Sequence, residues 1–116
     1  MERAVRKQSF NIDCTVQNQV YDLYTCPANA RADVIFLTVT NHVSSTNISI
    51  YWYDASKAST VVLAEAKNFA ANETSTYNSG FTIVLEAGDK IQIKPSSNPT
   101  PHVDAICTVL ETFVPI

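Results

Sequence analysis

Hydrophobic and polar residues alternate along most of this chain with the two-residue period of β-strands. Between residues 48 and 53, Ile48, Ile50 and Trp52 fall on one side, and the residues between them fall on the other. This spacing predicts a strand with one buried face and makes Trp52 a core residue. No long stretch has apolar residues at helical spacing, so the pattern predicts an all-β protein.

Eight strands are expected from runs of β-branched and aromatic residues that clusters of Asn, Asp, Ser and Pro separate. They cover residues 20–26, 33–40, 48–53, 60–66, 75–77, 82–85, 90–94 and 103–113, and an extended segment around residues 5–12 would add another. Turns recur about every 8 to 12 residues, as they do in sandwiches and jelly rolls. We therefore expect an antiparallel β-sandwich, jelly-roll-like, with about eight strands in two sheets.

The segment 103–113 differs from the others because both of its faces carry apolar residues. Such a strand either lies at the centre of a sheet or turns its outer face toward a partner. The apolar run at residues 34–39 has the same character and predicts a strand that is covered on both sides.

A chain of 116 residues is long enough for one hydrophobic core. We expect a single sandwich domain over residues 19–116, preceded by an extended arm at residues 1–18. The arm holds three of the eight basic residues, with apolar side chains between them. A frayed, charged tail is the ordinary explanation; the functional alternative is an arm that binds a neighbouring protein through Arg3, Val5, Arg6, Lys7 and Phe10.

The overall composition bears on possible partners. A net charge of -3 provides no basic field for nucleic acid, so no nucleic-acid partner is expected. No apolar run approaches the roughly 18 to 20 residues of a membrane-spanning helix, and the first ten residues lack the apolar stretch of a secretory signal. Charged residues make up only 16% of the chain, and such a weakly charged surface suits contact with other proteins.

Residues that could carry chemistry are few and scattered. His102, Asp104 and a serine could form a catalytic triad, but a solvated loop histidine is the commoner role, and His42 has the same explanation. The aspartates lack the one-three-five spacing of calcium loops. Cys14, Cys26 and Cys107 are odd in number and have no CxxC spacing, which favours reduced thiols over a disulfide framework or a zinc site. A Cys14–Cys26 bridge is the alternative, but Cys26 and Cys107 lie in strand-like runs, where a buried thiol is the commoner role. We expect no enzymatic activity, no cofactor and no metal.

Tyr51, Trp52 and Tyr53 are the main argument for a sugar-binding face, because exposed aromatic rings stack on sugars. The alternation instead buries Trp52, and tyrosines favour strands for packing alone. The sequons at Asn47 and Asn72 are read as chance in a chain rich in asparagine.

Four short motifs stand out along the chain: Tyr24 with Cys26, Pro27, Ala28 and Asn29; Trp52, Tyr53 and Asp54; Ala87, Gly88 and Asp89; and Val109, Leu110 and Glu111. Together they resemble the motifs of small virion structural proteins of tailed bacteriophages. The likeness extends over most of the domain. Each motif also has a mechanical role, since Gly88 can adopt a positive φ in a turn between two strands. The motifs specify a fold and not a reaction.

The resemblance implies a capsid cement or decoration protein that binds the major capsid protein or other virion proteins. It would be made in the host cytoplasm and would lie on the capsid surface. The low surface charge adds the expectation of a homo-oligomer, and a trimer suits a position where three coat subunits meet. The alternatives are a neck or tail component, a carbohydrate- or receptor-binding module and, last, a small hydrolase.

Overall fold

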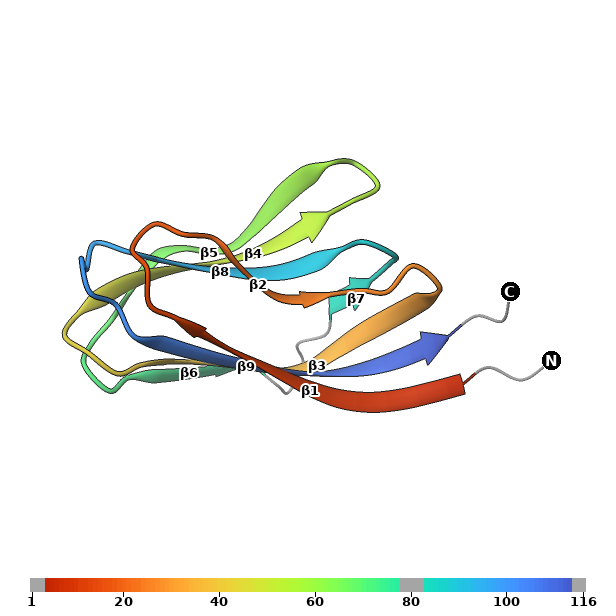
Figure 1. Ribbon diagram of the computed structural model, residues 1–116, viewed down its shortest axis with the longest axis horizontal. Helices are drawn as coiled ribbons and strands as arrows, with labels where there is room; N and C mark the ends of the chain where they lie inside the picture. Colours follow the sequence, from red (N-terminus) through yellow and green to blue (C-terminus); the bar gives the residue numbers. More distant parts are fainter. Residues whose placement is uncertain (1–3, 78–82, 114–116) are drawn as a thin grey trace.

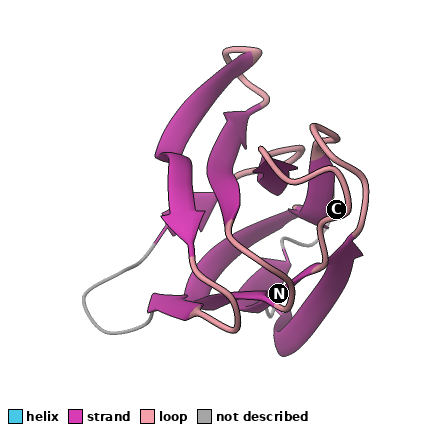
Figure 2. Ribbon diagram, turned by 90° about the vertical axis from the view of Figure 1, so that its left-hand side faces the viewer, coloured by secondary structure: helices cyan, strands magenta, loops and turns pink. Residues whose placement is uncertain are grey.

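The computed structural model describes residues 4–77 and 83–113, and this part of the chain contains nine β-strands and no helix. The strands form two antiparallel sheets that face each other (Figure 1). Viewed from the end, only strands and loops make up the two layers (Figure 2). No helix in the described ranges could cross a membrane.

The first sheet has five strands, in the order β1–β9–β3–β6, with β7 also paired to β3. Its members are β1 (Ala4–Cys14), β9 (Val103–Phe113), β3 (Ala30–Asn41), β6 (Thr74–Tyr77) and β7 (Ile83–Leu85). The second sheet has the order β2–β8–β4–β5. Its members are β2 (Tyr21–Thr25), β8 (Lys90–Ser96), β4 (Thr46–Asp54) and β5 (Ser59–Phe69).

The chain passes between the two sheets six times, the last time from β8 into β9, which is the winding of a jelly roll. The expected fold class is therefore confirmed. Each expected strand is present with its ends shifted by a few residues, and the extended segment near residues 5–12 is β1. Thr82, the expected first residue of β7, lies outside the described residues.

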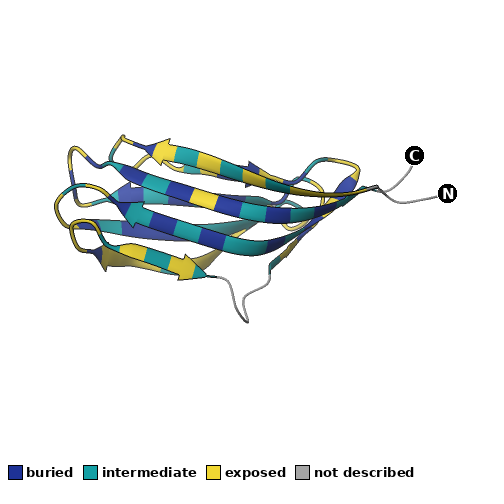
Figure 3. Ribbon diagram, turned by 90° about the horizontal axis from the view of Figure 1, so that it is seen from below, coloured by how far each residue is buried: buried dark blue, intermediate teal, exposed yellow. Residues whose placement is uncertain are grey.

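The core lies between the sheets and is built by strand alternation. In β9 the inward residues are Val103, Ala105, Cys107, Val109 and Glu111, and all five are buried. The outward Ile106 is 41% exposed. β9 lies between β1 and β3, so of the two alternatives given by the sequence, a central strand or one that faces a partner, the central position is the one observed. The alternating bands of burial along this sheet are visible in Figure 3.

The segment expected to be an arm, residues 1–18, supplies an edge strand in its described part. All eleven residues of β1 pair with β9, from Ala4 opposite Phe113 to Cys14 opposite Val103. Strand pairing therefore decides which way each side chain of this segment points.

Trp52 is less buried than the sequence predicted. It lies opposite the fully buried Ile91 and packs against the core, as the alternation requires. Its side chain is nevertheless only half-buried, because the end of the β4–β5 hairpin rises away from the facing sheet (Figure 1). Trp52 is a border residue of the core, so the prediction that it is buried in the core is confirmed for its direction and its packing but not for the extent of its burial.

Three of the four motifs named above meet at one turn. Gly88 has a φ of 84° and donates its backbone amide to the carbonyl oxygen of Cys26 at 3.0 Å. The buried Asp89 accepts hydrogen bonds from the amides of Ala55 at 2.9 Å and Glu86 at 3.0 Å. The AGD turn thus fastens the loops that follow β2 and β4, which is a structural role.

Candidate functional site

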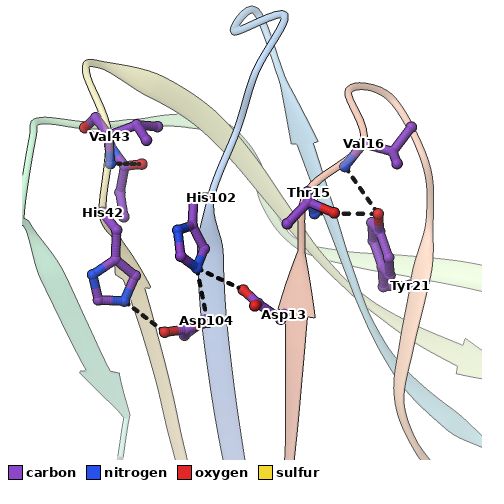
Figure 4. A network of polar contacts seen from close by, with 9 residues as sticks. Asp13, Thr15, Val16, Tyr21, His42, Val43, His102 and Asp104 are labelled. Carbon is purple, nitrogen blue, oxygen red and sulfur yellow. Dashed lines mark hydrogen bonds and ion pairs between the residues drawn. The ribbon is translucent and has the colours of Figure 1, made fainter.

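The most concentrated group of titratable side chains lies at one end of the five-stranded sheet, where β1 and β3 end and β9 begins. Four residues form it: Asp13, His42, His102 and Asp104 (Figure 4). We refer to them as the His–Asp cluster. They come from three segments that are far apart in the sequence.

Backbone pairing places these residues together. Asp13 and Asp104 are direct partners across the β1–β9 ladder. The amide of His42 donates a hydrogen bond to the carbonyl oxygen of His102 at 2.9 Å, which joins the end of β3 to the start of β9. His102 is two residues before Asp104, so both side chains project from the same side of this segment.

The side chains contact one another closely. His102 Nε2 lies 2.9 Å from Asp13 Oδ1 and 3.7 Å from Asp104 Oδ1. On the other side, His42 Nε2 lies 2.6 Å from Asp104 Oδ2. The two imidazole rings are tilted, with their centroids 5.0 Å apart. Asp104 therefore lies between the two histidines.

The two carboxyl groups differ in their affinity for a proton. A hydrogen bond with Asp104, together with partial burial and the charge of Asp104, raises the pKa of Asp13. Burial opposes ionisation of Asp104, but hydrogen bonds with Asp13 and His42 outweigh it and lower the pKa of Asp104.

The structure brings together two of the three residues imagined as a catalytic triad, His102 and Asp104. The side chains that complete the group are Asp13 and His42, and neither is a nucleophile of the serine type. What the cluster offers chemically is two imidazole nitrogens and two carboxylates, a set suited to hydrogen bonding and to metal ligation.

The residues expected to bind a partner are divided by the alternation of β1. Val5 and Lys7 point outward and are exposed, Val5 to 60%. Arg6 and Phe10 point toward the other sheet, where Arg6 pairs with Glu111 and Phe10 packs on Tyr24 with ring centroids 4.8 Å apart. Arg3 lies outside the described residues.

Glu111 is a charged residue in the core, with 1% of its surface exposed. It accepts hydrogen bonds from Tyr24 at 2.6 Å, Gln8 at 2.7 Å and Arg6 at 3.2 Å. Burial alone would raise the pKa of Glu111, but these hydrogen bonds and the Arg6 charge hold it below its usual value. The four residues line a groove of about 310 Å³ between β1 and β2.

Exposed apolar side chains occur on two surfaces. Val5, Val84 and Ile106 lie on the outer side of the five-stranded sheet. Val61, Val62 and Leu63 lie on β5, an edge strand of the second sheet. The sequence analysis singled out the outer face of β9 and missed β5, because edge position is a property of strand order and not of local pattern.

All three cysteines are buried free thiols. Burial raises the pKa of Cys14 and Cys107 to about 12 and that of Cys26 to about 11, with nearby carboxylates adding to the effect at Cys14 and Cys26. The sequence prediction of buried thiols is confirmed. Such thiols remain protonated at neutral pH and are poor nucleophiles.

The sequence matches no protein-family model and no curated protein. Solved structures share its fold at low sequence identity. One is a chain of the disulfide-linked pili of Bacillus endospore appendages, with a TM-score of 0.60 and 9% identity over 99% of this chain and 93% of that chain. Another comes from the acidic stable capsid of Helicobacter pylori bacteriophage KHP30, with a TM-score of 0.58, 14% identity, and coverage of 99% and 95%.

The third is from the infectious bursal disease virus Gx strain, with a TM-score of 0.57 and 12% identity. It covers 97% of this chain but only 33% of the viral one. At identities this low the likeness concerns the fold alone: this chain has the same jelly-roll architecture as these proteins.

Proposed function

We propose that this chain is a non-enzymatic virion structural protein, most specifically a capsid cement or decoration protein of a bacteriophage. The observation that carries the proposal is the superposition of the whole chain on nearly the whole length of a phage capsid chain. This chain is thus a jelly roll without large insertions, comparable in extent to that capsid subunit. The resemblance of its motifs to tailed-phage virion proteins supports the same class.

The surface also suits a protein that works by contact. Only 16% of the residues are charged, and the outer side of the five-stranded sheet exposes Val5, Val84 and Ile106. Apolar side chains on an otherwise polar sheet favour association with another protein surface. We propose that the part of this side around Val84 and Ile106 meets identical copies, with a trimer as the expected arrangement. Val5 and Lys7, nearer the start of β1, would contact the coat protein together with Arg3.

Two other functions have less support. A sugar-binding platform would need aromatic rings exposed together on one face. Tyr51 and Tyr53 share the outer face of β4 but are only partly exposed, and Trp52 between them points toward the core. A disulfide-linked assembly would need an accessible thiol, and all three thiols are buried. A neck or tail position is the remaining alternative, because fold and surface do not distinguish it from a capsid position.

The test is the copy number of the protein in purified particles from the source that encodes it, measured by quantitative mass spectrometry against the major capsid protein. A cement protein is expected in hundreds of copies per particle. A dozen copies or fewer would indicate the neck or tail, and its absence from particles would refute the virion proposal. A variant with Val5→Ser and Lys7→Glu should have lower occupancy, while one with Val62→Ser, on the other sheet, should not.

A further inference from the structure

The His–Asp cluster has no part in the proposed virion function. We propose that Asp13, His102 and Asp104 bind a divalent transition-metal ion of the zinc class, with His42 as an additional ligand beside Asp104. The argument rests on where the ligand atoms lie, on which atoms they are, and on an unusual strand pairing.

The ligand atoms are already close enough to share one ion. One ligand atom each from Asp13, His102 and Asp104 lie within 4.8 Å of one another. Zinc bonds of about 2.0 to 2.1 Å in tetrahedral geometry separate the ligand atoms by roughly 3.3 to 3.5 Å. The present separations from His102 Nε2, 2.9 and 3.7 Å, bracket that value. Small side-chain rotations are enough to admit the ion.

The types of ligand atom in the cluster indicate which class of metal ion it would bind. Calcium takes six to eight oxygen ligands and magnesium prefers octahedral oxygen sites. The His–Asp cluster instead offers imidazole nitrogen together with carboxylate oxygen, a mixture that suits zinc and its transition-metal neighbours. Two carboxylates also supply the negative charge that balances a divalent cation.

The pairing of Asp13 with Asp104 is a separate reason to expect a cation at the His–Asp cluster. Like charges directly opposite each other on antiparallel strands repel and destabilise the sheet. In the absence of metal, the contacts of the two histidines with these carboxylates lessen this repulsion. A divalent cation would remove it and would join the edge strand β1 to β9 and, through His42, to the end of β3 (Figure 4).

The experiment titrates zinc into the metal-stripped full-length protein and follows the heat of binding and the melting temperature. We expect one zinc ion per chain and a rise in melting temperature. Asp13→Asn and His102→Ala should each weaken binding by at least about tenfold, a loss of the size that disturbed metal sites show. Asp22→Asn is the matched control, since it makes the same charge change on β2, and it should bind as the wild type does.

A second measurement needs no variant. The chain has only two histidines, so their imidazole resonances are readily followed by NMR in the wild-type protein. Zinc should shift the signals of His102, and cobalt in its place should give the visible absorption of a tetrahedral nitrogen and oxygen site. The proposal is overturned if zinc does not bind, if Asp13→Asn and His102→Ala bind it unchanged, or if calcium binds as tightly as zinc.

Discussion

Tyr24 donates its phenolic hydrogen to the carboxylate of Glu111 at 2.6 Å, across the space between the two sheets. Tyr24 lies on β2 of one sheet and Glu111 on β9 of the other. Both belong to motifs that resemble phage virion proteins, and their contact explains why such motifs matter for the fold. A buried carboxylate with three donors fixes how one sheet lies on the other.

Replacing Glu111 with glutamine should show how much the negative charge of Glu111 contributes to the stability of the fold. The substitution keeps the size of the side chain but removes the ion pair with Arg6 and weakens the hydrogen bonds from Tyr24 and Gln8. We expect the free energy of unfolding at pH 7, measured by urea denaturation, to fall by about 1 to 3 kcal/mol. The exposed Glu65→Gln is the control and should change little.

The same carboxylate predicts a pH dependence. Because the folded-state pKa of Glu111 lies below its ordinary value of 4.5, the unfolded chain binds more protons near that pH. Its contribution is complete above about pH 4.5 and is lost as the pH falls through the lower folded value. Glu111→Gln should therefore flatten the acid limb of stability against pH. An acid limb as steep as that of the wild type would contradict this assignment.

Trp52 is the single tryptophan of the chain, so its fluorescence reports this site alone. Its half-burial predicts an emission maximum between those of buried and solvated indoles, with partial quenching by acrylamide. Trp52→Ala should lower the free energy of unfolding by about 2 to 3 kcal/mol, which is below the usual range for a fully buried aromatic residue. Emission at the wavelength of a fully solvated indole would refute the packing described here.

The three cysteines should be unreactive in the native protein. With pKa values of about 12 for Cys14 and Cys107 and about 11 for Cys26, the thiolate content at pH 8 is more than about a hundredfold below that of an ordinary thiol. Ellman's reagent should therefore react slowly with folded protein and promptly with three thiols in guanidinium chloride. Fast reaction of even one native thiol would show that a cysteine is accessible.

Self-association should depend on the outer side of the five-stranded sheet. Ile106→Glu places a charge on a residue that is 41% exposed, so it should spare the fold and dissociate the oligomer in sedimentation velocity. Val62→Glu, on the second sheet, is the matched control and should leave the oligomer intact. If Val62→Glu dissociates the oligomer and Ile106→Glu does not, the contact runs through β5; a wild-type monomer at all concentrations would refute self-association in solution.

The sequence predicted the local structure well because strand alternation and turn residues are local signals. It placed every strand, and the apolar residues on both faces of β9 gave a central position as one of two alternatives. It overestimated the burial of Trp52, since alternation tells which way a side chain points and not whether the facing sheet extends far enough to cover it.

The His–Asp cluster could not be predicted in the same way. Asp13, His42 and His102 are widely separated in sequence, and only the β1–β9 register and the backbone contact between His42 and His102 unite them. One signal was available: His102 and Asp104 stand two apart at a strand start, which places both on one side. Without the register of β1, nothing in the sequence indicates that Asp13 joins them.

The pairing of β1 with β9 also determines when the five-stranded sheet can form during synthesis of the chain. Strand β1 precedes the other described strands and finds its partner among them only when residues 103–113 have been synthesised. Until then β1 and the neighbouring edge of β3 have open backbone groups, and strands in that condition are prone to join the wrong chain. Folding of this sheet should therefore wait for β9 and take milliseconds to seconds, as expected for sheets that join distant segments. In a cell that produces many copies at once, that interval is when a chaperone would matter most.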